Sequence, residues 1–196
     1  MRTIEPRPVR STIHIMLLVC LGLPTALLAA WDVERLMQTL AQQKSSTASF
    51  VERKYIAMLD KPLESSGELS YQAPDRLEKR TLKPKPEWVL LDKDVLTIER
   101  GKQKISVQLA DTPEARAFVD SIRGTLAGDR KALERYYALS LYGTPERWKL
   151  TLLPSDQKIA ALLVRITFLG HGHRIDSIEY LQADGDRSVM AIEASP

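Results

Sequence analysis

The chain has 196 residues and a formal net charge of +3, a length that suits one domain with a proper hydrophobic core. Three arginines (Arg2, Arg7, Arg10) and one glutamate (Glu5) give the first thirty residues +2, so the remainder carries only +1. That near-neutral remainder gives no basis for a nucleic-acid partner. Cys20 is the only cysteine, so residues 31–196 can form no disulfide, thiolate metal site or cysteine nucleophile.

Residues 1–30 are predicted to be a secretory signal peptide. Arginines precede an apolar run over 13–30, which ends in small residues and offers a cleavage site at 28–30. The alternative is a membrane anchor, but Gly22 and Pro24 interrupt the run, and it is short for a bilayer span of about 20 residues. We therefore expect residues 31–196 to form a single exported domain.

The first element after this segment is predicted to be a helix over 31–43. Val33, Leu36, Met37 and Leu40 form one apolar stripe, and Asp32 can cap the helix. From there to residue 109 the sequence indicates only strands separated by short turns, which makes consecutive strands antiparallel neighbours. The predicted strands cover 48–59, 63–72, 76–82, 87–92, 95–100 and 102–109.

The middle of the chain changes to a helical pattern. We predict helices over 113–126 and 129–139, with Asp129 capping the second, and we expect Gly124 and Gly128 to loosen their junction. Helices in the middle of a sheet protein are expected to cross one mouth or face of the sheet.

The C-terminal third returns to strands, predicted over 147–153, 159–169, 174–182 and 188–193, with turns at 170–173 and 184–186. The total is about ten strands and three helices, an α+β fold. An antiparallel sheet of that size must curl.

Residue patterns for catalysis or metal binding are weak. His171 and His173 share one turn, and the remaining histidine, His14, lies in the N-terminal segment, whereas a zinc site needs three or four ligands. The chain has no G-x-S-x-G elbow and no phosphate-binding glycine loop. We expect no metal, no cofactor and no enzymatic activity, unless the histidine turn lies beside a serine or carboxylate in a cleft.

The aromatic residues leave two interpretations open. Trp88, Trp148, Tyr71, Phe50 and Phe118 are spread over the predicted strands and helices and can simply fill a core. A curled sheet crossed by helices can also hold one apolar ligand. Composition does not decide between a filled and a hollow interior.

Several segments together resemble one family. These are Ala48–Arg53, Pro62–Tyr71, Pro74–Leu77 and Trp88–Asp92, with Leu96 in the next strand. Their succession is similar to the F-x-Q, S-x-G-x-L, P-x-x-L/F and D-G turn motifs of the periplasmic outer-membrane lipoprotein carriers, the LolA family. The likeness extends over the whole exported chain in element order.

The resemblance implies a half-open β-barrel, a strongly curved antiparallel sheet whose concave face is covered by helices and holds acyl chains. Such a protein is a periplasmic monomer that catalyses no reaction. It takes lipid or lipoprotein from an inner-membrane transporter and carries it toward an outer-membrane acceptor. The rival interpretation is an adaptor of an envelope lipid or pigment exporter complex, with a filled interior.

Three positions depart from the family pattern. Glu52 stands where the family has Gln, and Lys93-Asp94 replaces the D-G turn. Ala73 occupies the place of an arginine that holds the helical lid closed in the best-known carriers. Arg76 and Arg80 are the candidates to replace that arginine, and the departures extend the possible cargo to other lipids or an acylated pigment precursor.

The predicted cavity residues follow from strand alternation and the helix stripes. For the cavity wall they are Leu69, Tyr71, Leu77, Trp88, Leu90, Leu96, Ile98, Trp148, Leu150 and Leu152. For the helical lid they are Phe118, Ile122, Leu126, Leu133 and Tyr137.

Overall fold

The computed structural model describes residues 31–194, so the predicted signal peptide lies outside the described residues. The helices are α1 (Val33–Leu40), η1 (Leu109–Asp111, a 3-10 turn), α2 (Pro113–Ala127), α3 (Arg130–Glu134) and α4 (Gln157–Ala160). The first six strands are β1 (Ser45–Tyr55), β2 (Leu63–Gln72), β3 (Arg76–Lys83), β4 (Glu87–Asp92), β5 (Val95–Arg100) and β6 (Gln103–Gln108). The last five are β7 (Tyr137–Thr144), β8 (Arg147–Pro154), β9 (Leu163–His171), β10 (Arg174–Gln182) and β11 (Arg187–Ala194).

All eleven strands form one antiparallel sheet in the order β6-β5-β4-β3-β2-β1-β11-β10-β9-β8-β7. Except for β6 and β7, strands that follow each other in sequence lie side by side, and β1 joins the two halves by pairing with both β2 and β11. The edge strands β6 and β7 do not pair with each other, so the sheet stays open. The predicted α+β class, with a half-open antiparallel sheet covered by helices, is confirmed.

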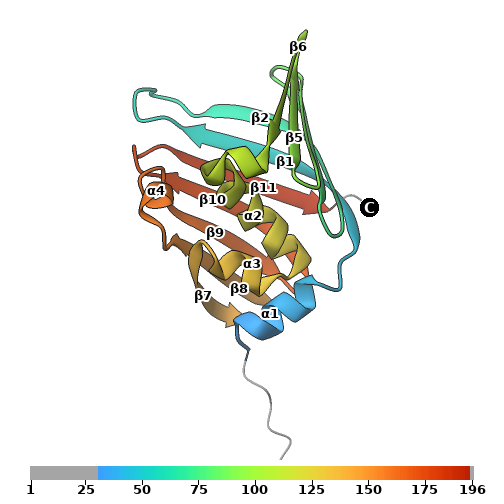
Figure 1. The fold of residues 1–196 in the computed structure, drawn as a ribbon, viewed down its shortest axis with the longest axis vertical. Helices are drawn as coiled ribbons and strands as arrows, with labels where there is room; N and C mark the ends of the chain where they lie inside the picture. Colours follow the sequence, from blue (N-terminus) through green and yellow to red (C-terminus); the bar gives the residue numbers. More distant parts are fainter. Residues whose placement is uncertain (1–30, 195–196) are drawn as a thin grey trace, which may run out of the picture. The chain divides into compact units, whose positions relative to one another are not determined.

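The connection between the two edge strands positions the helices. Because β6 and β7 lie at opposite edges, the chain between them must cross the whole sheet, and η1, α2 and α3 make up that crossing. Figure 1 shows α2 and α3 in front of the strands, with α1 beside them. The helices therefore cover one face of the sheet, which we call the inner face.

The helix ends are fixed by local chemistry. The Asp32 side chain accepts a hydrogen bond from the Arg35 amide at 2.9 Å and caps α1, as predicted. Gly128 ends α2 with φ of +66°, and a Cβ there would stand 2.2 Å from the Met37 carbonyl oxygen. Gly128 therefore lets α1 and α2 pack closely, the opposite of the predicted loosening.

Several predicted boundaries are wrong. The first helix, expected over 31–43, covers Val33–Leu40, and the first strand, expected over 48–59, covers Ser45–Tyr55. The helix expected over 129–139 ends at Glu134, and β7 begins at Tyr137, so Tyr137 lies on a strand and not on a lid helix. The strand expected from 159 begins at Leu163, after the short helix α4, whose first amides are capped by Asp156. In the last two places the apolar spacing fits a helix or a strand, and tertiary packing decides.

The main core fills one half of the inner face. Leu36, Met37 and Leu40 of α1 pack with inward residues of β8 and β9, including Trp148, Leu150, Leu152, Ile166 and Phe168. A smaller cluster joins Leu91, Leu109 and Val119 under the start of α2. Across residues 31–194, no helix is long and apolar enough to cross a bilayer.

Candidate functional site: a cavity between the sheet and α2

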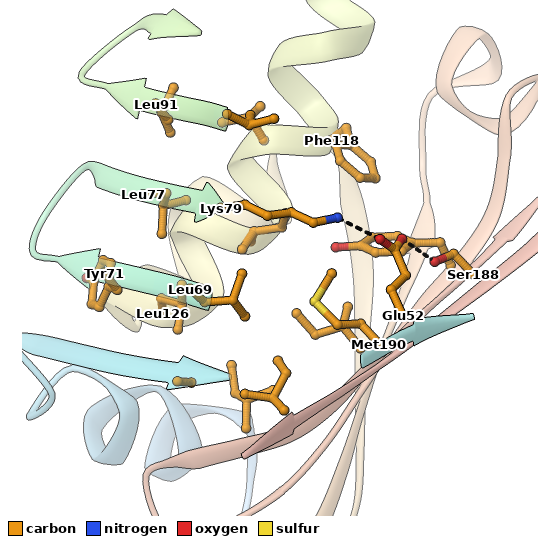
Figure 2. Close-up of a pocket in the computed structure, with 18 of the residues that line it drawn as sticks. Glu52, Leu69, Tyr71, Leu77, Lys79, Leu91, Phe118, Leu126, Ser188 and Met190 are labelled. Atoms are coloured by element: carbon orange, nitrogen blue, oxygen red, sulfur yellow. Dashed lines mark hydrogen bonds and ion pairs between the residues drawn. The ribbon is translucent and has the colours of Figure 1, made fainter. Parts of the chain in front are cut away.

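The other half of the inner face is hollow. A cavity of about 1160 Å³ lies between α2 and the inner face of β1–β5, β10 and β11. Its wall is mostly apolar, and Figure 2 shows leucine side chains from neighbouring strands pointing into it. The volume exceeds the roughly 300–1,000 Å³ of common small-molecule pockets.

One face of α2 forms the roof. Ala115, Phe118, Val119, Ile122 and Leu126 line the cavity at spacings of three and four residues, which place them on one side of a helix. The Phe118 ring lies 4.8 Å from the ring of Tyr180 on β10, so the roof rests on the opposite wall there.

Nine of the fifteen predicted site residues line this cavity. They are Leu69, Tyr71, Leu77, Leu96, Ile98, Phe118, Ile122, Leu126 and Tyr137. Tyr137 reaches it from β7, and its hydroxyl donates a hydrogen bond to the Ala117 carbonyl of α2 at 3.0 Å.

Two predicted wall residues on β4 point away from the cavity. Val89 and Leu91 line it in place of Trp88 and Leu90, because successive residues of a strand face opposite sides. The Trp88 indole N–H instead donates to the Glu78 carboxylate at 2.8 Å. The predicted register of this strand is therefore shifted by one residue.

Four more predicted residues belong to the filled half. Trp148, Leu150 and Leu152 of β8 face inward but are covered by helices, with at most 1 % of their surface exposed. Leu133 of α3 is also fully buried, against the backbone of α2 at Gly124. These four side chains stabilise the core and do not line the cavity.

A charged group that the sequence analysis did not assign lies in the cavity wall. The Lys79 Nζ atom is 2.6 Å from Glu52 Oε2, and the Ser188 hydroxyl donates to Glu52 Oε1 at 2.6 Å. Figure 2 shows this chain of contacts crossing the cavity from β3 to β1 and β11. The one sequence signal for it was Glu52 in place of the family's Gln.

The surroundings of the Glu52 carboxylate favour its ionised form. Burial by itself raises its pKa, but the charge of Lys79 and the hydrogen bonds from Lys79 and Ser188 outweigh that effect, with a smaller contribution from Lys54. The net result is a pKa below the usual value. Lys54 Nζ lies 3.7 Å from Glu52 Oε1 at the exposed side of the group.

Arginines of α2 hold the roof to the sheet. The Arg123 guanidinium donates to the Lys93 carbonyl at 2.8 Å and lies 3.2 Å from the Asp94 carboxylate, in the turn between β4 and β5. Arg116 lies 3.2 Å from the same carboxylate. Desolvation is the largest single effect on the pKa of Asp94 and raises it, but the hydrogen bonds and charges of the two arginines together outweigh it, so the pKa lies below its usual value.

The two arginines proposed from sequence to hold the lid make other contacts. Arg76 pairs with Asp92 at 2.9 Å, and Arg80 pairs with Glu78 beside it on β3. Within residues 31–194 neither forms an ion pair with α2.

The histidine turn lies at the cavity rim. His171 Nδ1 is 2.9 Å from Asp176 Oδ2, and both side chains are half-exposed. The carboxylate that the sequence analysis named as a condition for catalysis therefore lies beside His171 in the cavity lining, whereas in the described part of the chain no hydroxyl group hydrogen-bonds either histidine. Over the same residues, no group of three or more His, Cys, Asp or Glu side chains could hold a metal ion.

The comparison with protein families adds a match over nearly the whole chain. The family described as "Outer membrane lipoprotein carrier protein LolA-like" matches residues 25–194. The chain belongs to this LolA-like family. No curated protein matches the chain.

Solved structures with similar folds have little sequence in common with this LolA-like chain. A LolA superfamily protein from Nitrosomonas europaea is 10 % identical, with a TM-score of 0.46, over 84 % of this chain and 92 % of its own. A putative outer membrane lipoprotein-sorting protein domain from Vibrio parahaemolyticus is 9 % identical, with a TM-score of 0.43, over 84 % and 89 %. Lipoprotein LppX from Mycobacterium tuberculosis is 6 % identical, with a TM-score of 0.43, over 82 % and 93 %.

Proposed function

We propose that this LolA-like protein is a periplasmic carrier. It binds the acyl chains of a lipoprotein or another lipid in the cavity under α2 and carries them toward the outer membrane. In this proposal the signal peptide directs export and is removed, an inner-membrane transporter supplies the cargo, and an outer-membrane acceptor receives it. Residues 31–196 act as one domain.

The single observation that carries the proposal is the large, mostly apolar cavity beside a fully packed core. A fold that needed only stability would fill that space, because unfilled apolar volume costs free energy. Each methylene of a bound acyl chain that leaves water contributes about 0.8 kcal/mol. An acyl chain that is too apolar to cross an aqueous compartment alone is therefore stable in such a cavity.

The test is to purify the exported protein gently, weigh it by native mass spectrometry, and identify any lipid released by organic extraction. We expect a stoichiometric acyl species. A ligand-free mass, with no later uptake of a fluorescent fatty acid, would contradict the proposal and favour the adaptor of an exporter complex.

A pair of variants ties the binding to this cavity. Leu69→Glu places a charge in the wall and should abolish lipid uptake while the sheet stays folded. Leu82→Glu is the matched control, because Leu82 lies on the next strand, is 55 % exposed and does not line the cavity. It should bind lipid as the wild type does.

A further inference from the structure

We propose that the cargo is an anionic amphiphile and that Lys79 binds its negatively charged head group inside the cavity, while its chains lie along the apolar wall. This inference rests on the proposed carrier function and specifies the chemical class of the cargo.

The position of Lys79 is set by the sheet. Lys79 on β3 and Glu52 on β1 both point to the inner face, with β2 between them. Gly67 stands opposite Phe50 on β2 and adds no side chain there, and the Lys79 ammonium lies 4.9 Å from the centre of the Phe50 ring. The lysine therefore extends over β2 and presents its ammonium group within the cavity.

The Lys79 ammonium can donate more hydrogen bonds than the one it makes to Glu52. A lysine ammonium carries three N–H groups, and among residues 31–194 its only hydrogen-bond partner is Glu52. Both side chains line the cavity, and the Lys79 side chain is the more exposed of the two, at 25 % against 6 % for Glu52. A ligand with acceptor oxygens can take the remaining N–H groups.

The local charge favours an anion. Lys79 and Lys54 both lie near the single carboxylate of Glu52, at 2.6 and 3.7 Å, which leaves one positive charge in excess. Four other acidic residues line the cavity: Glu78 is paired with Arg80 and the Trp88 indole, Asp176 lies beside His171, and Glu114 and Glu193 complete the set. A bound anion would neutralise the excess positive charge beside a mostly apolar wall, where a charge interaction is stronger than in bulk water.

A neutral cargo would not explain why the charged pair of Lys79 and Glu52 lies in the cavity wall. Taking a lysine and a glutamate out of water is costly, and replacing such a pair by apolar residues is often neutral or stabilising. A wall that contacted only acyl chains would be apolar throughout. Figure 2 shows Leu69, Leu77 and Leu126 to one side of the Lys79 ammonium, where the chains of an amphiphile would lie.

The experiment compares ligands that share their acyl chains, one of each pair with an anionic head group and the other neutral. Dissociation constants are measured for oleate and methyl oleate at submicellar concentration, and for dioleoylphosphatidylglycerol and dioleoylglycerol in detergent-free transfer assays. For the wild-type protein we expect about tenfold or tighter binding of the anion in at least one of the two pairs, as for a charge-assisted hydrogen bond. The first pair tests a carboxylate and the second a phosphate.

Three variants assign the preference to Lys79. Lys79→Met alone would leave Glu52 buried without a cation, so it is made together with Glu52→Gln, and the double variant should lose the preference for the anion while still binding the neutral ligand. Glu52→Gln alone removes the competing carboxylate and should strengthen the preference. Lys83→Met, an exposed lysine on the same strand that does not line the cavity, should leave it unchanged.

The outcomes separate the two proposals. Neutral and anionic ligands bound equally by the wild type, or a preference that survives in the double variant, would overturn the head-group site and leave the carrier function standing. If neither ligand of either pair binds, the carrier function fails as well, and the head-group site with it.

Discussion

Arg123 of α2 and Asp94 of the β4–β5 turn join the roof of the cavity to the sheet, with 3.2 Å between guanidinium nitrogen and carboxylate oxygen. The family pattern places an arginine before the P-x-x-L/F motif, where this chain has Ala73. Here the arginine belongs to the helix, and the acid belongs to the turn in which Lys93-Asp94 replaces D-G. Asp94, one of the positions that depart from the family pattern, thus contributes the acid of this contact.

Asp94→Asn should loosen this roof with little loss of stability. Asp94 is half-exposed, so losing its charge should cost only about 1 kcal/mol of the free energy of unfolding. Release of a bound fluorescent fatty acid, measured by stopped flow, should become faster because α2 opens more readily. Asp92→Asn is the control, since Asp92 pairs with Arg76 on the neighbouring strand and not with α2. Equal release rates for both variants would contradict the assignment.

Arg123→Met should have a larger effect on stability. Arg123 also lies 2.5 Å from Asp120, which is 5 % exposed and would lose its cation. Leaving a buried carboxylate unpaired costs roughly 3 kcal/mol. Urea denaturation should therefore rank wild type above Asp94→Asn and Asp94→Asn above Arg123→Met. If Arg123→Met were more stable than Asp94→Asn, the buried Asp120 carboxylate would not need the positive charge of Arg123.

The strands of the first sheet half could be predicted because their signals are local. Proline, glycine and charged turns bracket them, and the predicted bounds 63–72, 87–92 and 95–100 coincide with β2, β4 and β5. Which side chains of a strand face the cavity was harder to predict. Residues 88–91 are all apolar, so alternation could not tell that Leu91 and not Leu90 faces the cavity.

Contacts between distant segments explain what the sequence could not reveal. Tyr137 lies on a strand and bonds Ala117 of α2, twenty residues away, and nothing nearby in sequence predicts this contact. Lys79 and Glu52 are twenty-seven residues apart in sequence. They form an ion pair because both side chains point to the inner face of the sheet from the two strands on either side of β2. Leu150 packs in the core that α1 covers, whereas Leu69 lines the cavity. This difference depends on where α1 packs, so the local sequence around the two leucines could not predict it.

That distinction predicts a difference in stability between two leucines. Leu150→Ala removes a side chain with 0 % exposure from the filled core and should cost about 2–5 kcal/mol. Leu69→Ala enlarges a cavity that already exists and should cost less than about 1 kcal/mol, because Leu69 lines the cavity and belongs to neither packed cluster. Urea denaturation of both variants measures the difference. Equal losses would mean that the hollow half is packed in solution.

Phe118→Ala should weaken the contact between the roof and the opposite wall. Its ring packs 4.8 Å from Tyr180, and aromatic pairs contribute about 0.5–1.5 kcal/mol beyond buried area. We expect faster release of bound fatty acid with a small change in stability. Tyr142→Ala is the control, because Tyr142 is 81 % exposed and lies outside the cavity. Faster release from the control variant as well would point to a general loosening of the fold.

Glu52 should make stability depend on pH in a defined direction. Its pKa in the folded protein is lowered from the usual 4.5 because, although burial opposes ionisation, Lys79 and Ser188 favour the charged form more strongly. A lowered carboxylate pKa contributes stability above the unfolded-state value, and this contribution is lost as the pH falls through the folded-state value. Glu52→Gln removes that contribution, so its deficit in unfolding free energy relative to wild type should shrink between about pH 6 and pH 3.

The difference between the two curves isolates Glu52, because Glu78 and Asp94, whose pKa values are also lowered, are present in both proteins and cancel. Urea denaturation at several pH values supplies the curves. Glu64→Gln, which removes an exposed glutamate paired with Arg53 on β1, is the control for the loss of a carboxylate outside the cavity. A deficit for Glu52→Gln that stays constant or grows toward low pH would mean that the carboxylate is not held ionised by Lys79.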